Sequence, residues 1–248
     1  NNILNIFLFI FLTVIFYEYK FFSGLQEILL FSFLVFLGKY FNKINDKNFL
    51  PVIIAIILFA NLFLWIKSEG IVYFTITMLS IILFSSTKIR NKVLITLSFS
   101  LLFLLKYYIY QVADIDINTQ KTFYNYNYIS SLNLEIILYK IMNITIWLIY
   151  YILTNIFFLI FVLLILFETL IVKKKIIQNF YQKVLYFYLI VILTFIYFAY
   201  ISRDMEIVYS IRTTMDRLVM TASGFFIYTS LVRISDYLKI YNIKKLLK

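Results

Sequence analysis

The sequence contains no cysteine and no histidine. Without cysteine the chain has no disulfide, no thiolate metal site and no cysteine nucleophile. Without histidine it has no imidazole base, no haem ligand of that type and no histidine zinc site. Proline occurs once and glycine four times, which favours long uninterrupted helices. Any chemistry must therefore use carboxylates, lysine, arginine, tyrosine and hydroxyl groups.

Apolar residues dominate instead: they make up 63% of the chain, and the mean hydropathy is +0.93. Soluble domains contain about 45–50% apolar residues, and a soluble core cannot absorb this excess. The alternating segments of about ten residues that an outer-membrane barrel needs are not visible. We therefore expect an all-α, polytopic transmembrane helix bundle that forms a single domain over residues 1–248.

The chain opens with Asn1 rather than Met and runs directly into an apolar segment. It shows neither the basic start nor the small-residue cleavage site of a signal peptide. We expect the chain to be the C-terminal part of a longer protein.

A helix needs about 20 apolar residues to cross a bilayer. We expect about eight spans, at residues 3–17, 24–41, 50–66, 71–87, 93–110, 147–171, 184–202 and 217–237. Leu134, Ile137, Leu138 and Ile141 follow a helical spacing, with polar residues elsewhere on the turn. This pattern predicts one further helix at about 132–146, which would lie on the outer membrane surface.

The basic residues separate the two sides of the predicted bundle. Fifteen of the 23 lysines and arginines fall in alternate connections and the C-terminal tail, and nine of the 12 carboxylates fall in the other connections. The positive-inside rule makes the basic side and the C-terminus cytoplasmic. We expect a protein of the plasma (inner) membrane. Because orientation accounts for the net charge of +11, we expect membrane lipid as a partner and no nucleic acid.

Charged residues gather at the start of the last predicted span, in YSIRTTMDRLVMTASGFFIY, residues 209–228. On a helical wheel Thr213, Arg217, Thr221 and Gly224 share one face about 80° wide. This polar stripe should face the bundle or a wet cavity rather than lipid. Arg212 and Asp216 are four residues apart, which predicts an ion pair along the helix, whereas Arg217 has no local partner.

The preceding loop adds Arg203, Asp204 and Glu206, which predicts a charged cluster on the outer side. Arginine suits bidentate binding of phosphate, and a lipid phosphate lies at this depth. The candidate residues are Arg217, Arg212 and Arg203 for lipid phosphate, supported by Asp216, Thr213 and Thr221. The alternative is that the charges only anchor two helix ends, which we favour for Arg203 and Glu206.

Two other sets of charges have structural alternatives. Glu168 lies one turn before Lys173, Lys174 and Lys175 and should pair with them or reach the interface. Asp114 and Asp116 are suited to a divalent cation, although a solvated loop is the commoner reason for such a pair. No phosphate-binding glycine loop, nucleophile elbow or metal-ligand spacing is present.

The stretch 197–228 resembles the C-terminal region of polytopic bacterial glycosyltransferases of the GT-C superfold, through the run Thr214-Met215-Asp216-Arg217-Leu218. The resemblance covers about 30 residues. It implies transfer of a sugar from a polyprenyl-phosphate-linked donor on the outer face, with Arg217 and Arg212 at the lipid phosphate. The family's acidic base lies in a long first outer loop. Here that loop is short and offers only Glu18 and Glu27, so we expect the base upstream, with Glu18 as the weaker candidate.

Two other classes of function remain open. One is a hydrophobic subunit of an organellar respiratory or ATP synthase complex, which the arginine in a late span suggests. Against this reading, a proton path normally places acidic groups or histidines within the spans, and Glu168 is the only clear carboxylate near one. The other is a polymerase, ligase or flippase for surface polysaccharide, which would share the outer arginines.

Overall fold

The computed structural model describes residues 26–44, 49–67, 69–114, 126–170 and 180–246. These residues form helices and no strand, which confirms the all-α fold. The helices are α2 (Gln26–Asn42), α3 (Phe49–Ile66), α4 (Gly70–Phe84), α5 (Ile89–Val112), α6 (Tyr126–Ser131), α7 (Leu134–Thr154), α8 (Ile156–Leu170), α9 (Phe180–Ile201) and α10 (Ile207–Leu246).

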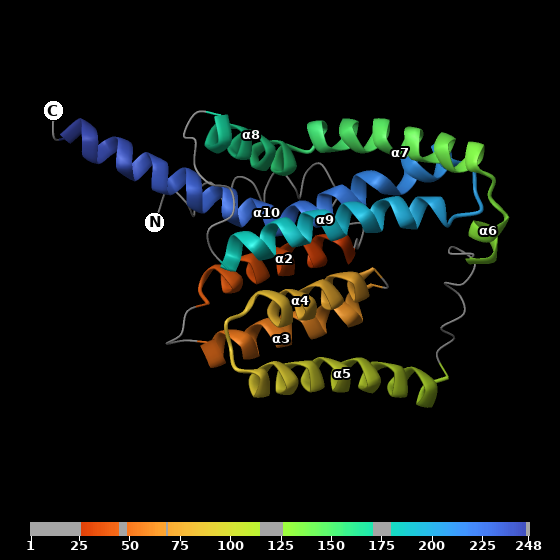
Figure 1. Cartoon of the computed structure of the whole chain (residues 1–248), viewed down its shortest axis with the longest axis horizontal. Helices are drawn as coiled ribbons and strands as arrows, with labels where there is room; N and C mark the ends of the chain where they lie inside the picture. Colours follow the sequence, from red (N-terminus) through yellow and green to blue (C-terminus); the bar gives the residue numbers. More distant parts are fainter. Residues whose placement is uncertain (1–25, 45–48, 68, 115–125, 171–179, 247–248) are drawn as a thin grey trace.

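The long helices lie along one common axis and alternate in direction, except that α8 continues in the direction of α7 (Figure 1). Among the described residues, α3, α5, α7, α9 and residues 207–238 of α10 are long and apolar enough to cross a membrane, and α4 and α8 are shorter apolar helices. The polytopic transmembrane bundle is therefore confirmed. Six of the predicted spans match α2, α3, α4, α5, α9 and α10. The predicted span 147–171 is wrong, because it is divided between the end of α7 and α8, and the predicted span 3–17 lies outside the described residues.

We call the end of the bundle where α10 begins the mouth end, and the opposite end the tail end. The starts of α2, α4 and α7 and the ends of α3, α5 and α9 lie at the mouth end (Figure 1). The last turns of α10 extend past the other helices at the tail end. This alternation places acidic and basic connections at opposite ends, as the charge pattern predicts.

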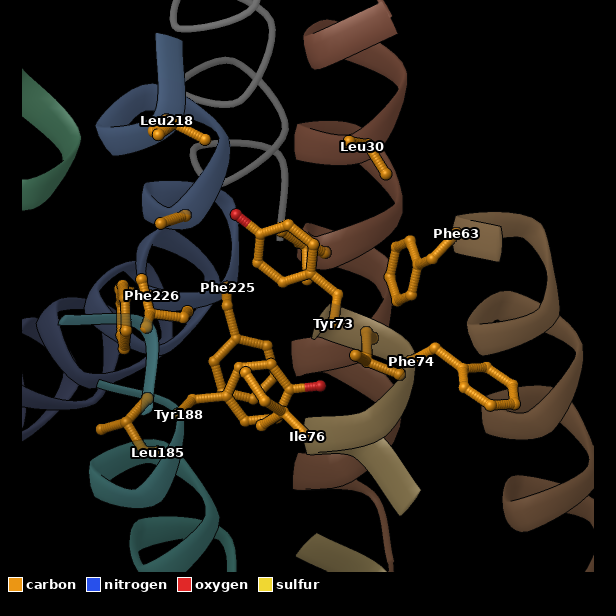
Figure 2. Close-up of a cluster of buried hydrophobic side chains, with 14 of the residues drawn as sticks. Leu30, Phe63, Tyr73, Phe74, Ile76, Leu185, Tyr188, Leu218, Phe225 and Phe226 are labelled. Atoms are coloured by element: carbon orange, nitrogen blue, oxygen red, sulfur yellow. The ribbon is translucent and has the colours of Figure 1, made fainter. Parts of the chain in front are cut away.

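Helix α10 lies at the centre and packs on α2, α7, α8 and α9, while α3 joins α2 to α4. Phe225 of α10 stacks on Tyr188 of α9, with ring centroids 4.0 Å apart (Figure 2). The Tyr188 hydroxyl is hydrogen-bonded to Thr77 of α4. Helix α5 lies at the edge, and only Ile95 and Phe99 of its 24 residues are buried. Because lipid tails are as apolar as a protein core, this edge helix needs no further apolar partner.

The surface helix predicted at 132–146 has different bounds, because α7 runs on without a break from Leu134 to Thr154. The helix breaks at Asn155, whose N–H bonds to the carbonyl of Tyr151 at 2.9 Å and whose side chain accepts from the N–H of Phe158 at 3.0 Å. One asparagine therefore ends α7 and begins α8, and the two helices follow each other along one line (Figure 1). The spacing of apolar residues cannot show such a break, because it indicates which side of a helix is apolar and not where the helix ends.

The face of α7 that packs on the bundle is not the apolar row of the predicted surface helix. Leu134 is 71% exposed and Leu138 56% exposed, whereas Lys140 is only 4% exposed. The Lys140 ammonium donates to the carbonyls of Ile201 at 3.2 Å and Arg203 at 2.8 Å, at the C-terminal end of α9. A cation at this position satisfies carbonyls that the helix itself cannot pair.

Two further lysines are used in the same way. Lys106 of α5 donates to a carbonyl in the last turn of α3, and Lys92 donates to a carbonyl in the last turn of α4 at 2.7 Å. In each case the lysine belongs to one helix and the carbonyls to another. Because lipid offers no hydrogen-bond donors, these contacts satisfy helix ends that would otherwise be costly.

Candidate functional site: the arginine mouth

The three candidate arginines lie in three different surroundings. Arg203 is buried in the turn between α9 and α10. One of its terminal nitrogens donates to Ser210 Oγ at 2.8 Å and to Thr214 Oγ1 at 3.0 Å. Its guanidinium carbon lies 4.9 Å from the centre of the Tyr200 ring. These contacts hold the turn together inside the protein, where an incoming lipid phosphate has no access.

Arg212 is exposed and lies against α7. Its guanidinium carbon is 5.2 Å from the centre of the Trp147 ring. The predicted ion pair with Asp216 is not formed, and within the described ranges Arg212 has no carboxylate partner. An arginine stacked on an aromatic ring uses the face of its guanidinium and leaves the edge, with its N–H groups, open for a ligand.

Arg217 lies on the other side of α10, against α2. One terminal nitrogen is 3.4 Å from Glu27 Oε1 and the other donates to the carbonyl of Thr213 at 3.1 Å. The same Glu27 oxygen accepts from Lys67 at 2.8 Å, and Lys67 is 3.4 Å from Glu69. We call Glu27, Lys67, Glu69 and Arg217 the ionic cluster. It links α2, α10 and the connection between α3 and α4.

Glu27 is the residue of this cluster whose role sequence reasoning missed. It is 190 residues from Arg217, so no local pattern links the two. A signal was nevertheless present in the topology. The predicted spans 24–41, 71–87 and 217–237 all start at the same membrane face, and Glu27, Glu69 and Arg217 all lie at or near those starts. Charges at one depth in a membrane tend to pair, because each is costly alone.

Between the two arginines, the first turns of α10 present an exposed polar face. Tyr209 is 63% exposed, Thr213 is exposed, and the Arg217 side chain is 39% exposed. Arg212 and Arg217 are five positions apart in the sequence, so they point about 140° apart around the helix. We call this face, with an arginine at each edge, the arginine mouth. An anion lying over Thr213 would have a guanidinium on both sides, and the Asp216 carboxylate lies on the Arg212 side of the same face.

Deeper along α10 the polar stripe is packed against α2. Thr221 is buried, and its hydroxyl donates to the carbonyl of Arg217 at 2.8 Å. A Cβ atom added at Gly224 would lie 2.5 Å from the carbonyl oxygen of Phe31. The stripe below Arg217 therefore faces the bundle, as one of our two expectations had it. Its small residues allow two helix backbones to approach closely.

A second interhelical ion pair lies at the tail end. Glu168 of α8 is 2.5 Å from a terminal nitrogen of Arg233 of α10, and Tyr237 donates to the other carboxylate oxygen at 3.1 Å. The lysines that we expected to pair with Glu168, residues 173–175, lie outside the described residues. Both carboxylate oxygens of Glu168 are occupied within the bundle, so it is not free to serve an external ligand.

The remaining candidates are only partly covered by the structure. Glu18 and Asp116 lie outside the described residues, and Asp114 is exposed at the end of α5. Within the described ranges, no three histidine, cysteine, aspartate or glutamate residues come together as potential metal ligands.

Comparison of the chain with models of known protein families, with curated proteins and with solved structures finds no match. The case for a function therefore depends on the geometry of the arginine mouth.

Proposed function

We propose that the arginine mouth binds the phosphate of a lipid-linked sugar, and that the chain is the membrane part of a glycosyltransferase that uses a polyprenyl-phosphate-linked donor. The observation that supports this proposal is Arg212, which is exposed, stacked on Trp147, and without a carboxylate partner in the part of the chain that the structure describes. Arg217 offers a second guanidinium across the exposed Thr213.

The position of the mouth agrees with this ligand. It lies toward one end of the bundle (Figure 1). In a bilayer the ends of spanning helices lie near the depth of the lipid phosphates. In sugar transfer the bond between the anomeric carbon and the phosphate oxygen breaks, and the acceptor hydroxyl forms the new bond. Arginines at the phosphate stabilise the negative charge that develops on the leaving group.

The reaction also needs a base to take the proton of the acceptor hydroxyl. Glu27 is poorly placed for this, because its side chain is only 6% exposed and one oxygen is shared between Lys67 and Arg217. We therefore assign the base to a carboxylate outside the described residues, with Glu18 as the candidate within this chain.

The test is binding of a polyprenyl phosphate to the purified full chain in nanodiscs of a neutral phospholipid. Arg212→Gln and Arg217→Gln should each weaken binding by about tenfold or more, since a hydrogen bond to a charged group contributes about 1.5–3 kcal/mol. Arg90→Gln is the control, because Arg90 is an exposed arginine at the tail end. Equal affinity in all three variants and the wild type would refute the proposal.

A polymerase, ligase or flippase for lipid-linked polysaccharide would contact the same phosphate through the same arginines. An assay with a radiolabelled donor separates the enzymes from a flippase. An enzyme changes the covalent state of the sugar, whereas a flippase changes only the side of the membrane on which the donor lies. A subunit of an energy-converting complex would instead purify in a stable stoichiometric assembly and ignore the donor.

A further inference from the structure

Glu27 holds its two cations at unequal distances. Its Oε1 atom is 2.8 Å from the Lys67 ammonium and 3.4 Å from the Arg217 guanidinium. Charge-assisted hydrogen bonds between nitrogen and oxygen are usually about 2.7–2.9 Å long. The contact with Lys67 is therefore a full hydrogen bond, whereas the contact with Arg217 is long and involves a single oxygen.

This asymmetry decides what happens when Arg217 moves. A buried carboxylate left without a cation is costly, but Glu27 keeps Lys67 when Arg217 leaves. Arg217 is the more exposed of the two, at 39% against 26% for Lys67, and its other nitrogen already donates to the carbonyl of Thr213 beside the exposed face. Arg217 can therefore turn from Glu27 toward the mouth at small cost.

We propose that Glu27 sets the affinity of the arginine mouth, because its carboxylate competes with the phosphate of the ligand for Arg217. The inference depends on the function proposed above and adds a residue that competes with the ligand. Without ligand, Arg217 rests on Glu27. With ligand, Arg217 transfers to the phosphate, and Lys67 alone balances the charge of Glu27.

The charges of the ionic cluster determine whether Glu27→Gln strengthens or weakens ligand binding. The cluster contains two carboxylates and two cations, so it is neutral as built. Glu27→Gln removes the competitor, keeps the shape of the side chain and leaves the cluster with one net positive charge. Half-exposed ion pairs are weak, so the competitor should lower the affinity by no more than about fivefold. Removing it should tighten binding by up to that factor.

The experiment titrates the full chain in neutral nanodiscs with a polyprenyl phosphate and, separately, with inorganic phosphate. Glu27→Gln should bind more tightly than the wild type, by about two- to fivefold. Glu206→Gln should stay near the wild type, because Glu206 is an exposed carboxylate at the same end and has no ion pair within the described ranges. Tightening for both ligands assigns the competition to phosphate itself, and tightening for the lipid alone assigns it to lipid-borne phosphate.

Unchanged or weaker binding of both ligands by Glu27→Gln would overturn the inference. A merely structural role for Glu27 predicts weaker binding, since damage to the fold cannot create affinity. In the Glu27→Gln/Arg217→Gln double variant, the tightening relative to Arg217→Gln alone should vanish. Tightening that persists there contradicts competition through Arg217.

If Glu27→Gln does not fold, a second variant, Glu27→Asp, tests the same competition. Glu27→Asp retains the charge for Lys67 but shortens the side chain by one methylene, so the contact with Arg217 that is already long is lost first. We expect intermediate tightening, and affinity at or below the wild-type value would count against the inference. If binding depends on neither Arg212 nor Arg217, the proposed function itself fails. Binding that needs them while both Glu27 variants stay at the wild-type affinity refutes only the inference.

Discussion

At Gly224 the backbone of α10 closely approaches that of α2, and replacement of this glycine by alanine tests that contact directly. The added Cβ atom would lie 2.5 Å from the carbonyl oxygen of Phe31 and 2.9 Å from a ring carbon of the same residue. The oxygen belongs to the backbone of a packed helix, so α2 as a whole must shift. Overpacking of this kind costs about 1–3 kcal/mol.

Alanine also favours the helix over glycine by about 1 kcal/mol, which offsets part of that cost. Because the clash is with backbone, its cost should lie in the upper part of that range, so we expect a net loss of about 1–2 kcal/mol for Gly224→Ala. This loss corresponds to a melting temperature on the order of 5 °C lower. The assay is thermal unfolding of the detergent-solubilised chain, followed by circular dichroism at 222 nm.

Gly38→Ala is the matched control on the facing helix. Its added Cβ atom would lie 3.1 Å from the carbonyl oxygen of Phe225 and 3.5 Å from the Tyr181 hydroxyl. A shift of a few tenths of an ångström relieves this contact, and the gain in helix propensity offsets it. We expect a change within about 0.5 kcal/mol. A Gly224→Ala protein as stable as the wild type, or less damaged than Gly38→Ala, would refute the close approach.

Three further substitutions test contacts between helices. Arg233→Gln should lower the free energy of unfolding by about 3–5 kcal/mol, because it leaves the Glu168 carboxylate buried without its cation, and adding Glu168→Gln should restore most of that loss. Lys140→Met should cost about 1–3 kcal/mol by leaving carbonyls at the end of α9 unpaired, and faster amide hydrogen exchange in the 202–206 turn would report it. Tyr188→Phe should cost about 1 kcal/mol through its lost hydrogen bond to α4, and a loss as large as that of Tyr188→Ala would show that the ring stacking has failed as well.

The helical spans could be predicted from the sequence because their causes are local. A run of apolar residues specifies a membrane helix by its length, and the position of lysines and arginines specifies the direction of the chain. The pairing of charges could not be predicted in the same way. Whether Arg217 meets Glu27, or Glu168 meets Arg233, depends on how each helix is rotated against its neighbours.

Helix α7 shows a second limit of sequence reasoning. Its apolar spacing was real, but the buried face is set by Lys140, which bonds to the end of α9. The prediction of the candidate site was limited for a related reason. Arg203, Arg212 and Arg217 are close in sequence, yet their side chains leave α10 and its preceding turn in three directions.

The two ion pairs of α10 have a mechanical consequence. Arg217 and Arg233 are 16 residues apart, which is about 24 Å along the helix axis, and they point in directions about 160° apart. One fastens α10 to α2 and the other fastens it to α8. Two ion pairs on nearly opposite sides of α10, about four turns apart, resist rotation of the helix about its own axis. If a ligand draws Arg217 away from Glu27, the ion pair at the mouth end opens, whereas the pair at the tail end and the close contact of Gly224 with α2 still hold α10 in place.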